Sequence, residues 1–410
     1  MALSDLQIQT LQREAIERAT AGDFERAEPL LAQVADALPN SGQALQLLGQ
    51  ARLKLGRFAE AREPLERAAK FLPRDAAAQV NAAGCLMILS EHQAALAFLD
   101  RAQRLDPSQA GIAHNRGRAL EGLGRFDEAE RAYDHALSID HRLRPALSAR
   151  ASLLLARGDW SGALADLDMA LVNRPDDAPL RQRRGEILLH QGDWMRGLAD
   201  HEARLEAPGD RYVPALPQWQ GEPLTGRLLI YPEQVDISGA AAVRDTLMLA
   251  RGLGAAADTV VQCSAEVADW LDMPTIRRSD SLDDFAAAAA LRSLPHLLGW
   301  TLQTLPPPAK ARAAAQPGDR VGWFTRAAEA PTGLVVERDP AQVGCCKLVV
   351  GDDSAPLHLA ALMGIPSIVV LGPSADWLWG PRSGPSPWYA TLEVLHDGES
   401  EKLAERLGRC

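Results

Sequence analysis

Apolar and polar positions follow two different patterns in the two halves of the chain. From about residue 8 to residue 205, small and apolar positions recur every 34 residues. The repeated positions are glycine (Gly22, Gly56, Gly124, Gly158, Gly192, with Ser90 at the missing node), alanine (Ala27, Ala61, Ala95, Ala129, Ala163) and proline (Pro39, Pro73, Pro107, Pro175). Glycine permits a tight reversal and proline cannot continue a helix, so each period predicts a helix, a turn and a second helix.

This pattern resembles the tetratricopeptide repeat, and six units fit between residues 8 and 205. The resemblance implies a right-handed superhelix whose concave groove is lined by the first helix of each unit. The sixth unit carries Gly197, His201 and Arg204 where other units have small or apolar residues. We therefore expect it to cap the array or to dock it on the second half of the chain.

Two asparagines lie at the same position of consecutive units, Asn81 and Asn115. An amide on the groove face can both donate to and accept from an extended peptide backbone. The pair is similar to the asparagine ladder of protein O-GlcNAc transferases, which implies a peptide-binding groove, and Arg118 and neighbouring arginines would add positive charge. The alternative is that these are ordinary solvated helix residues.

After residue 206 the period ends, and a proline-rich stretch leads into short apolar runs that alternate with helical segments. We predict strands at 228–231, 259–262, 321–324, 334–337, 347–350, 367–371 and 391–395. We predict helices at 240–253, 265–271, 285–291, 356–363 and 400–407. The predicted fold is an α-helical repeat domain followed by a doubly wound α/β domain, with one lobe at 206–315 and a second, shortened lobe at 316–410.

The most informative segment for function is residues 347–372. Its sequence predicts a buried strand, a polar turn, a helix and a second buried strand, in that order. The turn contains Asp352, Asp353 and Ser354, and His358 lies one turn into the helix. The beginning of a helix presents free backbone N–H groups, which suit a phosphate. Ser354 can cap this helix or bind a ligand oxygen.

This segment resembles the strand–D[ST]xxxHLAxALGxP–strand segment of heptosyltransferase-like GT-B glycosyltransferases, including bacterial members fused to tetratricopeptide repeats. Residues 375–379 and 386–389, and upstream residues 219–224 and 228–234, are also similar to stretches of that family. The resemblance implies a nucleotide sugar held by Asp353, Ser354 and His358, with Arg326 as the basic group. It also implies that Asp245 is the base that takes the proton of the acceptor hydroxyl.

The chain departs from that family at two places. Val243 and Arg244 stand where glycines are expected before Asp245, and only about 22 residues separate Phe324 from Lys347. Two functions are compatible with this pattern. The first is a protein glycosyltransferase whose groove binds an acceptor polypeptide such as flagellin or another surface protein. The second is a non-catalytic adaptor whose degenerate transferase domain serves protein–protein interaction.

Composition narrows the class of protein. Hydrophobic residues make up 47% and charged residues 24%, which excludes a disordered chain, and a net charge of −11 disfavours nucleic acid as the main partner. Five cysteines without a CxxC motif, and the lack of a long uncharged apolar run, indicate a cytoplasmic protein without a membrane span. We expect no metal, because Asp352 and Asp353 lack further ligands at suitable spacing, and no cofactor besides the nucleotide sugar substrate. Trp377, Trp379 and Trp388 are expected to pack on the sheet rather than to hold a sugar.

Overall fold

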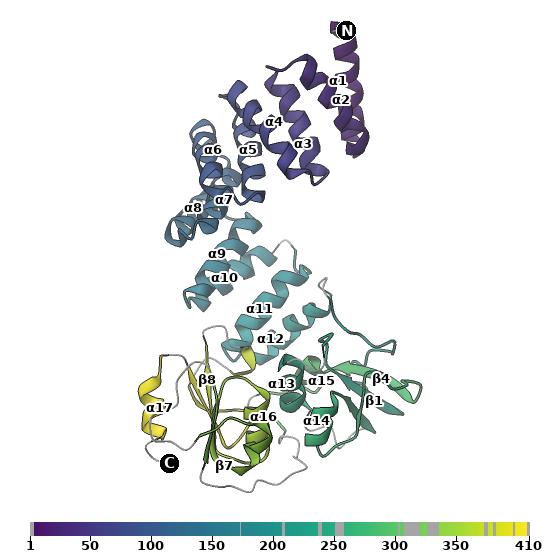
Figure 1. Cartoon of the computed structure of the whole chain (residues 1–410), viewed down its shortest axis with the longest axis vertical. Coiled ribbons are helices and arrows are strands. Elements are labelled where there is room, and N and C mark those ends of the chain that lie inside the picture. Colours follow the sequence, from purple (N-terminus) through teal and green to yellow (C-terminus); the bar gives the residue numbers. More distant parts are fainter. Residues whose placement is uncertain are drawn as a thin grey trace. The chain divides into compact units, whose positions relative to one another are not determined.

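The computed structural model describes residues 4–172, 174–206, 210–236, 240–250, 258–301, 304–306, 320–325, 336–372, 376–379, 383–396 and 398–407. The chain divides into two compact units, Met1–Pro175 and Asp176–Cys410. Figure 1 labels the elements of both units.

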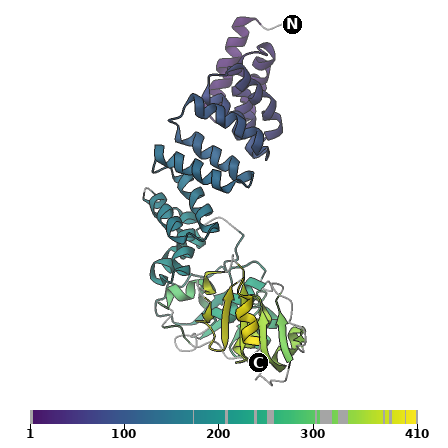
Figure 2. The same ribbon diagram turned by 90° about the vertical axis from the view of Figure 1, so that its left-hand side faces the viewer.

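The first unit consists of five antiparallel helix pairs, each spanning one 34-residue period (Figure 2). The helices are α1 (Asp5–Thr20), α2 (Phe24–Ala37), α3 (Gly42–Lys54), α4 (Phe58–Phe71), α5 (Ala76–Ile88), α6 (His92–Leu105), α7 (Ala110–Gly122), α8 (Phe126–Ile139), α9 (Arg144–Ala156) and α10 (Trp160–Leu171). The predicted helix–turn–helix period is confirmed.

The repeated small residues allow the helices to pack closely. The five recurrent alanines are fully buried, and the recurrent glycines all adopt the left-handed conformation, with φ between 70° at Gly124 and 86° at Gly192. At Gly117, an added Cβ would lie 2.3 Å from the ring of Tyr133. Ser90 takes the same left-handed turn at φ 62° without being glycine, which is unfavourable for a residue with a Cβ atom.

The second unit begins with a sixth helix pair, α11 (Ala178–His190) and α12 (Trp194–His201), followed by the 3-10 turn η1 (Glu202–Leu205). A four-stranded parallel sheet follows, in the order β3-β2-β1-β4. Its strands are β1 (Arg227–Tyr231), β2 (Thr259–Gln262), β3 (Thr275–Ile276) and β4 (Phe285–Ala290), with α13 (Ala240–Leu249) after β1 and α14 (Ala265–Trp270) after β2.

One element has a different type from the predicted one. The five consecutive alanines of residues 285–291 predict a helix, but 285–290 form strand β4. This strand pairs along β1, and four of its five alanines are buried, so tertiary pairing overrides the helical preference of alanine. Helical structure starts after it, in η3 (Leu291–Ser293) and α15 (Leu294–Leu297).

A second, six-stranded sheet has the order β6-β5-β7-β8-β10-β9 and is parallel except for β9. Its strands are β5 (Arg320–Phe324), β6 (Val336–Glu337), β7 (Cys346–Gly351), β8 (Ser367–Leu371), β9 (Gly384–Pro385) and β10 (Leu392–His396). Helix α16 (Ala355–Leu362) and helix α17 (Ser400–Leu407) pack on its two faces, and η4 (Pro340–Cys345) and η5 (Trp377–Trp379) connect strands. The remaining predicted strands lie close to the observed ones, whereas β3 and β9 are not predicted by the sequence pattern.

One hydrophobic core joins the two sheets and the sixth helix pair. It includes Val243 and Leu247 of α13, Leu357 of α16, and Trp194 and Leu198 of α12. The sixth repeat is therefore part of the same packed body as both sheets. No helix in the described ranges is long and apolar enough to cross a membrane.

Ser90→Gly should stabilise the repeat array. Glycine relieves the left-handed strain but adds freedom to the unfolded chain, so the free energy of unfolding should rise by about 0.5–1 kcal/mol. Urea unfolding followed by circular dichroism measures the change. The reverse substitution at the equivalent position of another repeat, Gly56→Ser, should lower the free energy of unfolding. If Ser90→Gly were no more stable than the wild type, the left-handed turn at Ser90 would not be strained.

Candidate functional site

A cluster of charged side chains lies where the elements of the two sheets meet. It consists of Arg244 and Asp245 on α13, Arg292 in η3, Asp353 after β7 and Asp376 before η5. We call these five residues the charge cluster. Parallel strands place their carboxyl ends at one edge of a sheet, where ligands of α/β proteins usually bind, and both β4 and β7 lead into the cluster at that end.

Asp245, the predicted base, is only 1% exposed. Its Oδ1 accepts from Nε and Nη2 of Arg244 at 2.9 and 2.8 Å and from Nη2 of Arg292 at 3.2 Å. Its Oδ2 accepts from Nε of Arg292 at 2.7 Å and from Nε2 of Gln234 at 2.8 Å. Burial alone raises the pKa of this carboxyl, but the two guanidinium groups outweigh burial and hold the pKa below its usual value. The group is a weak proton acceptor in this arrangement.

The two arginines also bind the other carboxylates of the cluster. Arg244 donates to Asp353 and to Asp376, both at 3.0 Å, and Arg292 donates to Asp376 at 2.7 Å. Asp245 belongs to the four-stranded side and Asp353 to the six-stranded side. The cluster is thus an ionic connection between the two sheets.

His358, predicted to face the donor, is fully buried. Its Nε2 lies 2.9 Å from Oδ1 of Asp353, its Nδ1 lies 3.2 Å from the hydroxyl of Tyr389, and its ring stacks on Trp379 at 5.5 Å. Burial raises the pKa of Asp353, but the hydrogen bond and charge of His358, with the charge of Arg244, lower it to about 2. Both nitrogens of the histidine are thus engaged inside the protein.

Ser354 is the N-cap residue of helix α16, but its side chain makes no capping hydrogen bond. Its hydroxyl donates to the backbone oxygen of Asp352 at 3.1 Å. Arg326, the predicted basic group, lies outside the described residues. Among the residues that the structure describes, no group of three or more His, Cys, Asp or Glu side chains is placed to hold a metal ion.

The sixth repeat reaches the edge of the charge cluster. Burial raises the pKa of Glu186 on α11, whose carboxylate interacts with Asp376 and Arg292, and burial lowers the pKa of His190 on the same helix. Trp388, from the C-terminal stretch, also packs against the sixth repeat. Trp388 lies against Trp194 at 5.8 Å and donates from Nε1 to the oxygen of Leu378.

Trp379 and Trp388 are 2% and 1% exposed, so they are buried packing residues rather than an open platform for a sugar. They pack not only on the sheet but also against His358 and the sixth repeat, respectively. The side chain of Trp377 lies outside the described part of the chain.

A second buried ion group holds the end of the sixth repeat. Arg204, 7% exposed, donates to Glu202 at 2.5 Å, to Glu233 at 2.9 Å and to the hydroxyl of Ser293 at 2.8 Å. The sequence pattern identifies Arg204 only as a departure from the repeat. Its placement after the last repeat helix, in a position that is otherwise small or apolar, is the signal that points to this role.

The predicted groove residues lie on neighbouring helices of the first unit. Asn81 is on α5 and Asn115 on α7, which contact each other, and both side chains are half-buried. Within the described ranges neither amide makes a hydrogen bond. Gly84 and Gly111 on the same helices have no atom within 4 Å of the place where a Cβ would lie. These two helices therefore offer free amides beside open backbone.

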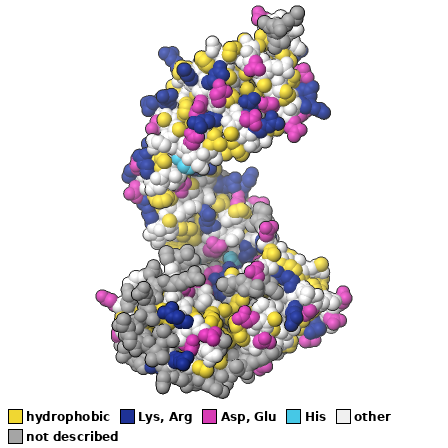
Figure 3. Space-filling model, viewed as in Figure 1, with side chains coloured by type: hydrophobic (Ala, Val, Ile, Leu, Met, Phe, Trp, Pro, Cys, Tyr) yellow, Lys and Arg dark blue, Asp and Glu magenta, His cyan; other side chains and the backbone are white. Residues whose placement is uncertain are grey.

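Much of the positive charge expected near these amides is neutralised. Arg116 donates to Asp100 at 2.9 Å, Arg150 to Asp134 and Asp166 at 2.6 Å each. Arg181 in the second unit donates to Asp200 at 3.4 Å. Arg118 is exposed. Figure 3 shows basic and acidic side chains interspersed on the visible face of the repeats.

Comparisons with known proteins agree on the repeat half. Three tetratricopeptide repeat models match residues 19–84, 110–143 and 148–210. The N-terminal part of the chain, to about residue 210, is therefore made of tetratricopeptide repeats, a repeat class that mediates protein–protein interaction. No curated protein matches the chain.

Solved structures with similarity to this chain include three repeat proteins. A thermophilic TPR protein of Thermus thermophilus is 27% identical, with 44% of this chain and 99% of that chain covered and a TM-score of 0.37. MamA, from residue 41 to its end, of Desulfovibrio magneticus is 19% identical, with 43% and 99% covered and a TM-score of 0.40. YrrB, described as a TPR protein with an unusual peptide-binding site, is 19% identical, with 42% and 90% covered and a TM-score of 0.38.

Asp353→Asn should remove a pH-dependent part of the stability. The pKa of Asp353 is about 2 in the folded protein and about 3.9 in an unfolded chain, so its contribution is complete above about pH 5 and is lost as the pH falls from about 4 to 2. The difference in free energy of unfolding between wild type and variant should shrink by up to roughly 2 kcal/mol across this range.

Chemical unfolding between pH 6 and pH 3 measures the first part of this change, about 1 kcal/mol. Asp284→Asn, at a carboxylate whose side chain is 83% exposed, is the matched control. A difference between wild type and Asp353→Asn that stays constant with pH would contradict the ion pairing of Asp353.

Proposed function

We propose that this protein is a peptide-binding adaptor. The groove of the repeats holds an extended segment of a partner protein, and the α/β region serves as a rigid platform rather than as a working transferase. The single observation that carries this proposal is the arrangement of Asp245, Asp353 and His358. Each of them uses its polar atoms on neighbours inside the protein.

A transferase would need these groups for a ligand. A general base must be able to receive a proton, and a donor site needs positive charge that is free to meet a diphosphate. Here both oxygens of Asp245 accept from arginines, and the same arginines are bound to three carboxylates. Freeing them would leave buried charges without partners, which is costly.

The groove has the features of a site for an extended backbone. Asn81 and Asn115 come from adjacent first helices, which pack about 8–10 Å apart, whereas an extended peptide advances about 3.3 Å per residue. The two amides would therefore hold peptide groups about three residues apart. The open space beside Gly84 and Gly111, where no atom lies within 4 Å of an added Cβ, leaves room for the peptide to lie close to the helices.

The double variant Asn81→Ala/Asn115→Ala should weaken peptide binding. The probes are peptides selected on the wild-type protein from a displayed library of random 12-residue sequences. Loss of two hydrogen-bonding amides, at roughly 1 kcal/mol each, should raise the dissociation constant by about 30-fold. Fluorescence anisotropy of the selected peptides measures this constant.

Gln93→Ala is the matched control, because Gln93 is an exposed amide on α6, a second helix of its repeat. It should leave the affinity unchanged. Two results would contradict the proposal: a selection that yields no binding peptide, or selected peptides that bind the double variant as tightly as the wild type.

A glycosyltransferase is the second candidate function, and one specific observation favours it. Asp245 from one sheet, and Asp353 and His358 from the other, lie in one connected cluster, which is the proximity that a base and a donor site on two lobes would need. In this alternative, a nucleotide sugar binds near Ser354 and His358 with help from Arg326. Asp245 then serves as the base after the arginines move to the phosphates.

Nucleotide binding separates the two candidates. The adaptor proposal predicts that UDP, GDP, ADP, CMP and their sugar derivatives leave the melting temperature unchanged. A transferase would be stabilised by about 2.7 kcal/mol at a ligand concentration 100 times the dissociation constant. That gain should be reduced in Ser354→Ala and kept in the exposed-site control Ser108→Ala, and such a selective shift would favour the transferase.

A further inference from the structure

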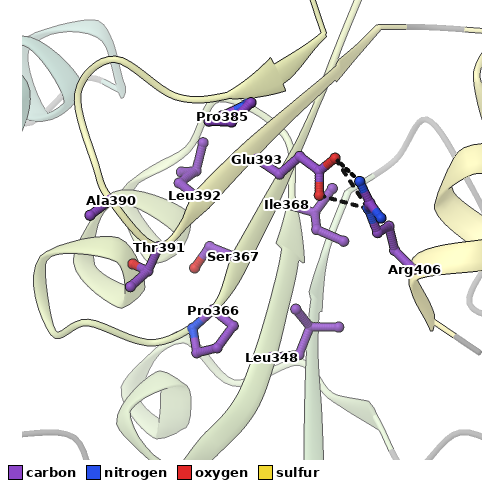
Figure 4. A pocket seen from close by; sticks show the side chains of 10 residues that line it. All are labelled: Leu348, Pro366, Ser367, Ile368, Pro385, Ala390, Thr391, Leu392, Glu393 and Arg406. Carbon is purple, nitrogen blue, oxygen red and sulfur yellow. Dashed lines mark hydrogen bonds and ion pairs between the residues drawn. The ribbon is translucent and has the colours of Figure 1, made fainter. Parts of the chain in front are cut away.

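Arg118 on α7 is exposed and, among the residues that the structure describes, makes no hydrogen bond or ion pair. Other arginines are neutralised within the protein. Arg52 on the first helix α3 donates to Glu28 at 2.8 Å. At the pocket of the second unit, Arg406 donates from Nε and Nη2 to both oxygens of Glu393, at 2.8 to 3.2 Å (Figure 4). Arg118 therefore presents a positive charge that a partner molecule can meet.

This charge lies on the groove face of the repeats. Arg118 follows the groove amide Asn115 by three residues, and residues three apart on a helix are neighbours on one face. Burial, together with the charge of Arg118, lowers the pKa of His114 to about 4, so this imidazole is uncharged at neutral pH. The residues at the same position of the first helices α3, α5 and α9 are uncharged: Gln50, Gly84 and Ser152. Arg118 is thus the charged residue of this row across α3, α5, α7 and α9.

The neighbouring helix α5 offers open space at the same level. Gly84 takes the position on α5 that Arg118 takes on α7, and no atom lies within 4 Å of the place where its Cβ would lie. Ile88, one turn further along α5, is 52% exposed. Residues four apart on a helix are neighbours, so a side chain that fills the space at Gly84 also touches Ile88. Burial of apolar surface there favours an aliphatic side chain.

The two positions also set the spacing of the partner's side chains. Gly84 and Arg118 are one repeat apart, as are Asn81 and Asn115, and their helices contact each other. An extended chain that crosses both helices advances about three residues between them. One side chain can therefore reach Arg118 while another, two to four residues away, reaches Gly84.

We infer that the groove selects an extended protein segment with an acidic side chain at Arg118 and an aliphatic side chain, two to four residues away, at Gly84 and Ile88. The inference rests on the proposed adaptor function, because it names the chemistry of the segment held in the same groove. The carboxylate belongs to a side chain rather than to a chain end, because α9 continues the row of first helices beyond α7.

Selection of displayed random 12-residue sequences on the wild-type protein tests this chemistry. The selected sequences should be enriched in Asp or Glu and in Leu, Ile or Val at the stated spacing. Non-specific attraction would instead enrich basic peptides, because the chain carries a net charge of −11.

The selected peptides, synthesised with amidated C-termini, are then measured by fluorescence anisotropy. They should bind Arg118→Gln about 5-fold more weakly and Arg118→Glu at least about 10-fold more weakly than the wild type. Replacing the acidic residue of a peptide by its amide should cost about 5-fold on the wild type and nothing further on Arg118→Gln, because the ion pair is already lost there.

Two further variants complete the design. Arg104→Glu, at an exposed arginine of the second helix α6, changes the net charge as Arg118→Glu does and should leave the affinity within about 2-fold. Gly84→Leu should raise the dissociation constant at least about 10-fold, because its side chain occupies the space of the aliphatic group. That space is empty in the protein, so the variant should keep the wild-type circular dichroism spectrum.

The outcomes separate this inference from the adaptor role itself. The inference would be overturned by selected peptides without acidic enrichment, or by binding that Gly84→Leu does not weaken. It would also be overturned if Arg118→Gln leaves an affinity unchanged that Asn81→Ala/Asn115→Ala lowers, and the adaptor role would then stand. A selection that yields no binding peptide would contradict both.

Discussion

The second unit depends on the burial of Asp245 between two guanidinium groups. A carboxylate that is 1% exposed is tolerated only when its charge is paired and its oxygens accept hydrogen bonds. Arg244 and Arg292 meet both needs, and each also binds a carboxylate from the other sheet. The two arginines that pair with Asp245 therefore also connect α13 and the end of β4 to the turn after β7 and to the start of η5. The chemistry of this site and the packing of the two sheets cannot be considered separately.

The sixth repeat extends this arrangement. Its helices contribute Trp194 and Leu198 to the core shared by both sheets, and its end is held by Arg204 through Glu233 and Ser293. A repeat array normally ends in a unit with a polar outer face. Here the last unit packs against the α/β region instead, which explains why Gly197, His201 and Arg204 depart from the repeat pattern.

The repeats could be predicted almost completely from the sequence, because turn conformation and helix crossing each require particular small residues at fixed spacing. Ser90 adopts the same left-handed turn as the glycines, so position in the period outweighs residue type there. Strand β4 could not be predicted, because its alanines favour a helix and only pairing with β1 makes them a strand. Without this strand the sequence gives no sign of the role of Arg292, which follows it.

The resemblance to glycosyltransferases implies separate roles for Asp245, Asp353 and His358, and the structure shows that these three residues are joined in one cluster. Their burial and mutual pairing are not visible in the sequence. The arginines that pair with Asp245 come from residue 244, where the family has glycine, and from residue 292, 47 positions along the chain. Sequence motifs identify which groups converge, but the fold decides whether a ligand can reach them.

The most direct test of this account is a double-mutant cycle for the free energy of unfolding, with Asp245→Leu, Arg292→Met and both together. If the cluster is a structural connection, each single variant should lose about 3–5 kcal/mol, because the partner charge stays buried without compensation. The double variant should lose less than the sum of the two by at least about 1 kcal/mol. Single variants as stable as the wild type, or more stable, would contradict the structural role of the charge cluster. They would indicate that the charges of Asp245 and Arg292 serve function at the expense of stability.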